Sequence, residues 1–201
     1  MSDRPQGNDG PRGRPPSRGS GGSRPPHREG AGRRPRGSQP ARRGGPPSRR
    51  AGHPPGAIRL ARLAGDDFEL VHPRGVHEVQ PDYEEGLELW RAGDPEGARD
   101  ALRYALSACH ENLWAHVALG KIAWEEFHDP SLARGHFGYA VDLARRAIPP
   151  SFSGRLPPDR PSNRPFYEAL DGLIRCLEAL GRREDCRGLR ELRDRLAAGG
   201  P

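Results

Sequence analysis

Hydrophobic side chains recur at helical spacing in this chain, but only after its first 57 residues. The clearest example is DPEGARDALRYAL, residues 94–106, where Ala98, Leu102 and Ala105 follow one another at intervals of four and three. Such intervals place the three side chains on one face of a helix. Asp94, directly before a proline, is suited to cap the first turn of that helix. The pattern therefore predicts a helix with one buried stripe.

The same pattern returns 35 residues later, in DPSLARGHFGYAV, residues 129–141. The two stretches match at the Asp-Pro start, at the Ala-Arg pair, at one large apolar residue and at Tyr-Ala. Ala133 and Phe137 begin the apolar stripe of the second copy. Each copy follows another stretch of helical character, residues 81–93 and 112–128. The repeating unit is therefore predicted to be a helix, a short turn and a second helix.

This arrangement resembles the tetratricopeptide repeat (TPR) family, whose units are about 34 residues long and carry a Leu-Gly step in the first helix. Leu119-Gly120 supplies that step, and Gly86 stands at the corresponding place in the first copy. Small residues there permit the two helices of a unit to approach closely. The resemblance covers residues 80–197. It implies an all-α fold, an antiparallel helix-hairpin array of the α-solenoid type with about three units.

The third unit is expected in residues 163–200, where the pattern is looser. Asn163 is predicted to cap its first helix, and Gly181 is predicted to end that helix. Cys186 takes the place of the small alanine in the second helix of the other units. A looser pattern is typical of a terminal repeat that closes a stack.

Two connecting segments do not fit the repeat. Residues 58–79 are predicted to form a short β-hairpin or an irregular lead-in, because apolar residues around Leu60 and Phe68 flank an Ala-Gly-Asp-Asp turn. The segment IPPSFSGRLPPDRPSNRP contains six prolines and cannot be a helix. We expect residues 147–164 to form a stiff, extended, proline-rich strap between the second and third units.

The charges divide the chain into two different parts. Residues 1–57 contain 13 arginines against three acidic residues, a net charge of +10, whereas residues 58–201 have a net charge of −4. The first part also contains 13 glycines and 12 prolines and has no aromatic residue. We therefore predict that residues 1–57 are a disordered basic tail, because such a segment cannot bury enough apolar surface to fold. Weak, non-specific attraction to nucleic acid is expected of it.

A more specific interpretation of the tail concerns Pro11-Arg12-Gly13-Arg14-Pro15. This pentapeptide resembles the core of an AT-hook, in which Arg12, Gly13 and Arg14 would enter the minor groove of A·T-rich DNA. The flanks lack the several basic residues that usually border the motif. A segment made largely of Arg, Gly and Pro also produces such a pentapeptide by chance. The sequence leaves both interpretations as alternatives.

The sequence offers no constellation that is typical of an enzyme. His110 and His116 are six residues apart and straddle a predicted helix boundary, so their imidazoles would not share a face for a metal ion. No phosphate loop, dinucleotide fingerprint or nucleophile elbow occurs. Three cysteines without a C-x-x-C pair argue against a disulfide framework or a zinc ribbon and favour the cytoplasm. We expect no catalytic residue, metal, cofactor, small-molecule substrate or membrane segment.

The remaining candidate is a binding surface. In the TPR family, the first helices of successive units line a concave groove that receives a partner peptide or helix. The matching positions here are Tyr83, Leu87, Arg91, Trp114, Val117, Lys121, Trp124 and Arg175. Aromatic and arginine side chains frequently anchor interfaces. For Trp90 and for one of Trp114 and Trp124, a place in the core is an equal alternative. We therefore expect a protein-binding scaffold or adaptor, with a nucleic-acid-associated protein as the alternative.

Overall fold

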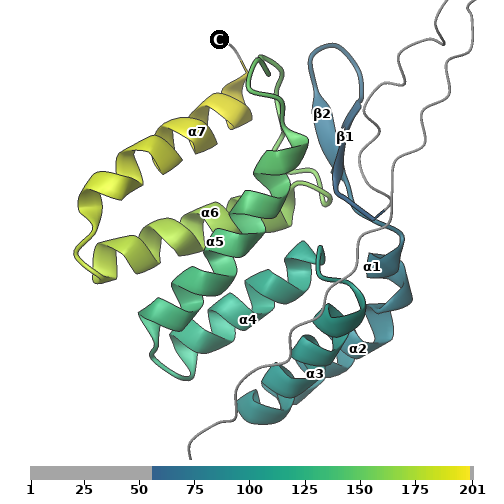
Figure 1. The fold of residues 1–201 in the computed structure, drawn as a ribbon, viewed down its shortest axis with the longest axis vertical. Coiled ribbons are helices and arrows are strands. Elements are labelled where there is room, and N and C mark those ends of the chain that lie inside the picture. Colours follow the sequence, from purple (N-terminus) through teal and green to yellow (C-terminus); the bar gives the residue numbers. More distant parts are fainter. Residues whose placement is uncertain (1–55, 200–201) are drawn as a thin grey trace, which may run out of the picture. The chain divides into compact units, whose positions relative to one another are not determined.

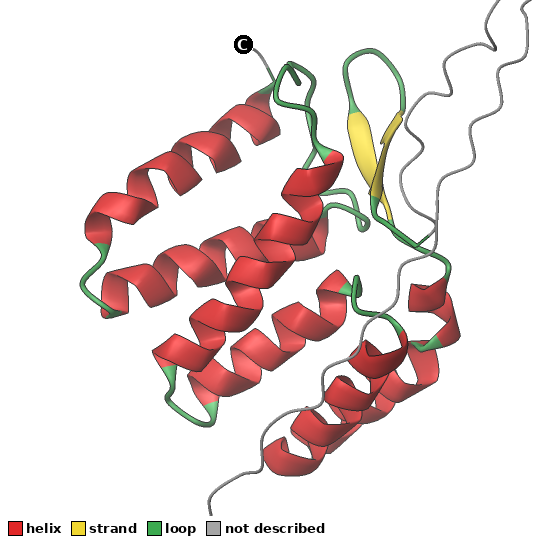
Figure 2. Cartoon of the chain, in the orientation of Figure 1, coloured by secondary structure: helices red, strands yellow, loops and turns green. Residues whose placement is uncertain are grey.

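The structure, a computed structural model, describes residues 56–199. These residues form seven α-helices, one short 3-10 helix and one two-stranded antiparallel sheet (Figures 1 and 2). The mostly helical architecture and the preceding β-hairpin confirm the coarse part of the sequence prediction. The disorder predicted for residues 1–57 concerns positions that lie, except for the last two, outside the described residues.

The helices form three consecutive pairs, α2–α3, α4–α5 and α6–α7, each joined by a short connection (Figure 1). The elements are β1 (Arg59–Arg62), β2 (Phe68–Val71), α1 (Gly75–Glu78), α2 (Gln80–Arg91), α3 (Pro95–Ala108), α4 (Leu113–Glu125), α5 (Pro130–Ala147), α6 (Arg164–Ala179), the 3-10 helix η1 (Arg183–Asp185) and α7 (Cys186–Ala198). The helices predicted for the two matching stretches of the sequence are present as α3 and α5.

The predicted caps of α3 and α5 are confirmed. The Asp94 carboxylate accepts a hydrogen bond from the Gly97 backbone N–H at 2.9 Å. The Asp129 carboxylate accepts from the N–H groups of Ser131 and Leu132 at 3.0 and 2.9 Å. Each aspartate therefore satisfies donors that have no partner within the first turn of a helix.

The core of the second helix pair is organised around Phe137 on α5. Its ring lies between two glycines, Gly120 on α4 and Gly172 on α6. A Cβ atom would lie 2.7 Å from Phe137 Cε1 if added to Gly120, and 2.6 Å from Phe137 Cζ if added to Gly172. Glycine at both positions thus permits α4 and α6 to pack closely against the same aromatic ring.

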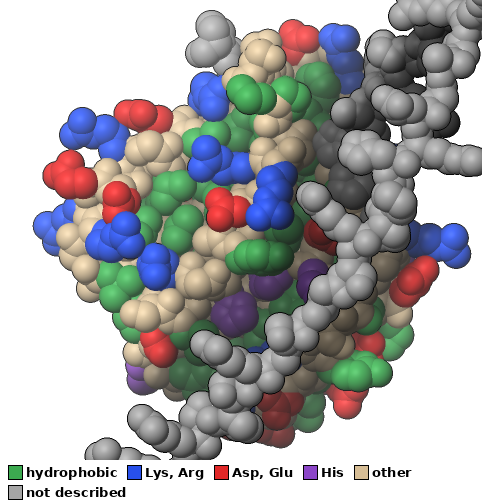
Figure 3. Space-filling model, viewed as in Figure 1, with side chains coloured by type: hydrophobic (Ala, Val, Ile, Leu, Met, Phe, Trp, Pro, Cys, Tyr) green, Lys and Arg blue, Asp and Glu red, His purple; other side chains and the backbone are tan. Residues whose placement is uncertain are grey.

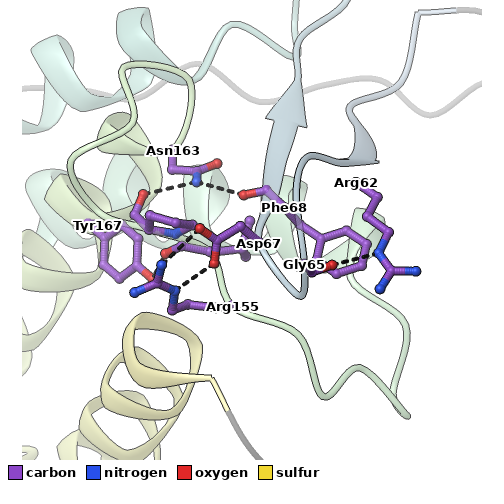
Figure 4. A network of polar contacts seen from close by, with 9 residues as sticks. Arg62, Gly65, Asp67, Phe68, Arg155, Asn163 and Tyr167 are labelled. Atoms are coloured by element: carbon purple, nitrogen blue, oxygen red, sulfur yellow. Dashed lines mark hydrogen bonds and ion pairs between the residues drawn. The ribbon is translucent and has the colours of Figure 1, made fainter.

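The hairpin is joined to the strap that precedes α6. In the hairpin, Leu60 is paired with Leu70 in antiparallel register. On the other side of β2, the Arg155 N–H donates to Asp66 O and the Phe68 N–H donates to Arg155 O, both at 2.7 Å. The Arg155 guanidinium also binds both carboxylate oxygens of Asp67, at 2.6 and 2.8 Å (Figure 4). The strap is therefore fixed to the hairpin by backbone and side-chain contacts.

The strap differs from the extended conformation that its prolines suggested. Backbone hydrogen bonds from Phe152 N to Pro149 O and from Arg160 N to Pro157 O close turns on either side of Arg155. The physical reason is packing: Leu156 is fully buried in the core, and its N–H donates to Leu196 O on α7 at 2.7 Å. The two turns direct the centre of the strap, at Leu156, toward the hydrophobic core.

The role of Asn163 also differs from the prediction. Its side chain makes no cap hydrogen bond to α6. Instead, the fully buried amide accepts from Leu70 N at 2.9 Å and donates to Phe68 O at 3.2 Å and Pro157 O at 3.0 Å (Figure 4). The side chain thus pairs with the outer edge of β2, where unpaired backbone groups in the interior would cost more than a missing helix cap.

Candidate functional site

Three of the predicted partner-binding residues, Lys121, Trp124 and Arg175, already contact other side chains of α4 and α6. Lys121 Nζ lies 2.7 Å from Glu168 Oε2, joining α4 to α6. The Arg175 guanidinium lies over the Trp124 ring at 5.8 Å from its centroid. Burial, together with the charge of Glu168, raises the pKa of the half-buried Tyr83. We call this surface the first-helix face; it consists of Tyr83, Leu87, Arg91, Lys121, Trp124 and Arg175.

Two residues predicted to bind a partner are placed elsewhere by the structure. Val117 is 4% exposed and belongs to the hydrophobic core. Trp114 is partly buried against Val76, Val79 and other core residues, and its ring lies 4.0 Å from the His72 ring, between centroids. The assignment of Val117 is corrected, because α4 packs against neighbours on several sides and the protein itself covers this side chain. The binding role of the partly buried Trp114 stays a prediction.

The remaining tryptophans have intermediate positions. Trp90 packs against the core of the first helix pair, and its Nε1 donates to Glu126 Oε1 at 2.8 Å. Leu87 lies partly buried in the same cluster. Trp124 packs against the main core beneath Arg175. Of the first-helix face, the two arginines Arg91 and Arg175 are exposed, whereas the other four side chains are partly buried.

An apolar hollow lies on a different surface, between the second helices of the first two pairs. It has a volume of about 460 Å³. Its walls come from α3 and the turn after it on one side and from α5 on the other, and α4 supplies its floor. We call it the α3–α5 groove; it is lined by Leu106, His110, His116, Leu132, Gly135, His136 and Tyr139. Figure 3 shows histidine and hydrophobic side chains gathered at the centre of this face.

Large apolar side chains remain accessible at the groove. Leu132 is 36% exposed and Tyr139 is 40% exposed, and with Tyr104 on α3 they are the exposed large hydrophobic residues among those the structure describes. Tyr104 is even more exposed, at 66%, but it does not line the groove. Exposed aromatic and aliphatic groups around a hollow are typical of interaction sites.

Two of the histidines of the α3–α5 groove, His116 and His136, favour an uncharged surface. His116 Nε2 lies 3.1 Å from His110 O, which can only accept, so His116 carries its proton on Nε2. Its ring lies 4.7 Å from the Tyr139 ring and 5.9 Å from the His136 ring, between centroids. Burial lowers the pKa of His116 to about 4, and burial with the charge of Arg103 lowers the pKa of His136. Both imidazoles are therefore neutral at pH 7.

Sequence reasoning missed this groove, although one signal for it was present. Tyr104 and Tyr139 occupy the same place in the two matching stretches, one position before the buried Ala105 and Ala140. A large aromatic residue on the outer face of both second helices indicates a surface beyond the first-helix face. The resemblance to the TPR family directed attention to the first helices instead.

The described residues contain no group of three or more His, Cys, Asp or Glu side chains able to hold a metal ion. His72 lies with Nε2 at 2.7 Å from Ser162 O, and its ring contacts the Trp114 ring at a tilt of 50°. Cys109, Cys176 and Cys186 are buried free thiols. Burial raises the pKa of Cys176 to about 11, which opposes formation of a thiolate nucleophile.

Two further predictions concern the AT-hook-like residues and membrane-spanning segments. Arg12, Gly13 and Arg14 lie outside the described residues. Between residues 56 and 199, none of the helices combines the length and the apolar character that crossing a bilayer requires.

Comparison with protein-family models, with curated proteins and with solved structures finds no match for this chain.

Proposed function

We propose that this chain is a protein-binding module built from three TPR-like units, α2–α3, α4–α5 and α6–α7. The repeated packing supports the proposal. A Cβ on Gly86 would lie 2.7 Å from Leu102 Cγ, and a Cβ on Gly120 would lie 2.7 Å from Phe137 Cε1. Gly86 and Gly120 are 34 residues apart, and Leu102 and Phe137 are 35 residues apart. In both units, therefore, a glycine of the first helix packs against a large residue of the second helix.

The observation that carries the binding function is the α3–α5 groove. It is large enough for one or two apolar side chains of a partner, and neither Asp, Glu, Lys nor Arg lines it. Covering Leu132 and Tyr139 would remove apolar surface from water, which is the main driving force of association. The partner is therefore a protein whose binding segment presents large apolar side chains.

The proposal places the primary contact in the groove and not on the first-helix face. Lys121 and Trp124 already have partners in Glu168 and Arg175, and a ligand would have to displace those contacts. The groove requires no such exchange. The module acts by recognition without a catalytic step, and three free buried thiols fit a reducing compartment such as the cytoplasm.

Site-specific photo-cross-linking of the full chain tests this function. Benzoylphenylalanine is placed at Leu132 in the groove, at Tyr104 outside it, or at Lys121 on the first-helix face, and each chain is irradiated in its source organism. We expect one protein partner to cross-link from position 132 and not from the other two. A partner that cross-links from position 121 but not from position 132 contradicts the groove as the binding site and supports the first-helix face instead.

A second candidate function rests on composition. The net charge of +10 in residues 1–57 favours association with nucleic acid through release of counterions. In that case, deleting these residues abolishes nucleic-acid binding, and the affinity of the full chain falls steeply between low and moderate salt. Substituting Arg12 and Arg14 by alanine separates the AT-hook interpretation from general attraction, because only a working hook loses its preference for A·T-rich duplex. Binding that survives the deletion contradicts this alternative.

A further inference from the structure

A second hollow lies between α7 and the C-terminal part of α5. Its volume is about 510 Å³. Ile148, Pro149 and Leu192 contribute apolar surface to it, and the rim is charged. We call it the α5–α7 groove; it is lined by Asp142, Arg145, Arg146, Ile148, Pro149, Pro150, Leu192 and Arg195. In contrast to the α3–α5 groove, three of its eight residues carry a permanent positive charge.

The three arginines of this groove are available to a ligand. Arg145, Arg146 and Arg195 are exposed, and none of them forms an ion pair with another described residue. Arg195 makes one long hydrogen bond of 3.5 Å, to Phe152 O. Asp142 is the single acidic residue of the lining, so the local net charge is +2. Guanidinium groups bind carboxylates with paired hydrogen bonds, which makes an acidic ligand the natural complement.

The two grooves lie along the same helix. Leu132, Tyr139 and Arg146 are seven residues apart in turn, which is close to two helical turns at each step. They therefore share one outer face of α5, and Tyr139 and Arg146 are separated by about 10 Å along the helix axis. A segment that follows this face passes from the apolar hollow to the arginines. Figure 3 shows basic side chains next to the histidine and hydrophobic cluster on this face.

We propose that the partner presents a segment in which large apolar side chains are followed by acidic residues, the apolar part occupying the α3–α5 groove and the carboxylates reaching Arg145, Arg146 and Arg195. This inference rests on the proposed function, because it assigns the chemistry of the partner that the α3–α5 groove binds. The charge complementarity orients the segment along α5 and excludes partners whose segment is basic.

Selection from a display library of random peptides on the full chain tests the inference. The enriched peptides are then measured against the wild type, the double variant Arg145→Glu/Arg146→Glu, and Leu132→Asp. The control is Arg183→Glu/Arg187→Glu, which changes the net charge equally at exposed positions outside both grooves. We expect peptides that combine apolar and acidic residues, and a loss of affinity of about tenfold or more for the double variant and for Leu132→Asp, with the control unchanged.

The other outcomes separate the two proposals. Enriched peptides that lack acidic residues, and that lose affinity for Leu132→Asp alone, overturn the inference about partner charge and leave the groove function intact. Acidic peptides that bind the double variant as tightly as the wild type also overturn the inference, because they are held elsewhere on the chain. Enriched peptides that all bind Leu132→Asp normally overturn both proposals.

Discussion

The side-chain amide of Asn163 pairs with the backbone of Leu70, 93 residues earlier in the chain, at 2.9 Å. Through the same amide, Asn163 also holds Phe68 O and Pro157 O. One fully buried side chain thereby joins the hairpin, the strap and the start of α6, and it replaces the strand that the outer edge of β2 would otherwise require.

The first prediction follows from this contact. Asn163→Ala removes three hydrogen bonds and leaves the Leu70 N–H and the Phe68 carbonyl without a partner, whereas Pro157 O still accepts from the Arg160 N–H. We expect the free energy of unfolding to fall by about 2–4 kcal/mol, as measured by urea denaturation. Asp159→Ala, at an exposed position of the same strap, is the control. A loss for Asn163→Ala no larger than that of the control would falsify the assigned role.

The second prediction concerns the glycines around Phe137. Alanine normally stabilises a helix relative to glycine by about 1 kcal/mol, but Gly120→Ala and Gly172→Ala each place a Cβ within the Phe137 ring contact. We expect each to lower the free energy of unfolding by about 1–3 kcal/mol. Gly188→Ala on α7, where no atom lies within 4 Å of the added Cβ, is expected to be neutral or stabilising.

A compensating substitution makes this prediction sharper. Phe137→Leu removes the ring atoms that meet the new methyl group, so Gly172→Ala is expected to cost less in the Phe137→Leu background than in the wild type. Equal losses in both backgrounds, measured by thermal or urea denaturation, would show that the helix spacing is not set by this contact.

The third prediction is a dependence of stability on pH. Burial lowers the pKa of His116 to about 4 in the folded state, whereas the unfolded chain has an ordinary histidine pKa near 6.5. The unfolded state therefore binds more protons between these two values, and the free energy of unfolding falls as the pH decreases from about 6.5 to 4. The contribution amounts to about 3 kcal/mol across this window.

The measurement is a series of denaturation curves between pH 7 and pH 4. His116→Gln cannot titrate, so its free energy of unfolding should decrease less over this range than that of the wild type, whatever its value at pH 7. His128→Gln, at an exposed position, should retain the wild-type slope. If His116→Gln and the wild type run parallel, the buried imidazole is not the source of the effect.

The fourth prediction separates stability from binding on the first-helix face. Lys121→Glu replaces an attractive contact with Glu168 by a repulsive one at a partly exposed site, and we expect a loss of stability of at most about 1 kcal/mol. Trp114→Ala, in contrast, removes the ring that packs on His72 and the core, and should cost about 3 kcal/mol or more. A Trp114→Ala variant that keeps its stability but binds the partner less tightly would show that Trp114 belongs to the binding surface.

The sequence predicted the helices well where local rules decide the outcome. The intervals between Ala98, Leu102 and Ala105 predicted the buried stripe of α3, and the Asp-Pro pairs predicted where α3 and α5 begin. The alternation around the Ala-Gly-Asp-Asp turn predicted the hairpin. These features depend on residues within one or two turns of each other, so one sequence suffices to recognise them.

The sequence failed where contacts join distant parts of the chain. Asn163 was assigned to a helix cap because its neighbours in sequence suggested one, whereas its partners lie on β2 and in the strap. Val117 was assigned to the surface because a first-helix position was expected to face solvent, but α4 is covered on several sides. The α3–α5 groove combines residues from the three helices α3, α4 and α5 and from the turn between α3 and α4, and no local pattern encodes that combination.

The most direct test of the account is the affinity of the cross-linked partner, once purified, for single variants of the full chain. Isothermal titration calorimetry compares Tyr139→Ala in the groove with Tyr104→Ala, which removes the equivalent exposed tyrosine outside it. We predict a loss of affinity of about tenfold or more for Tyr139→Ala and less than about twofold for Tyr104→Ala and Lys121→Glu. Normal binding by Tyr139→Ala together with a large loss for Lys121→Glu would contradict the account and assign the function to the first-helix face.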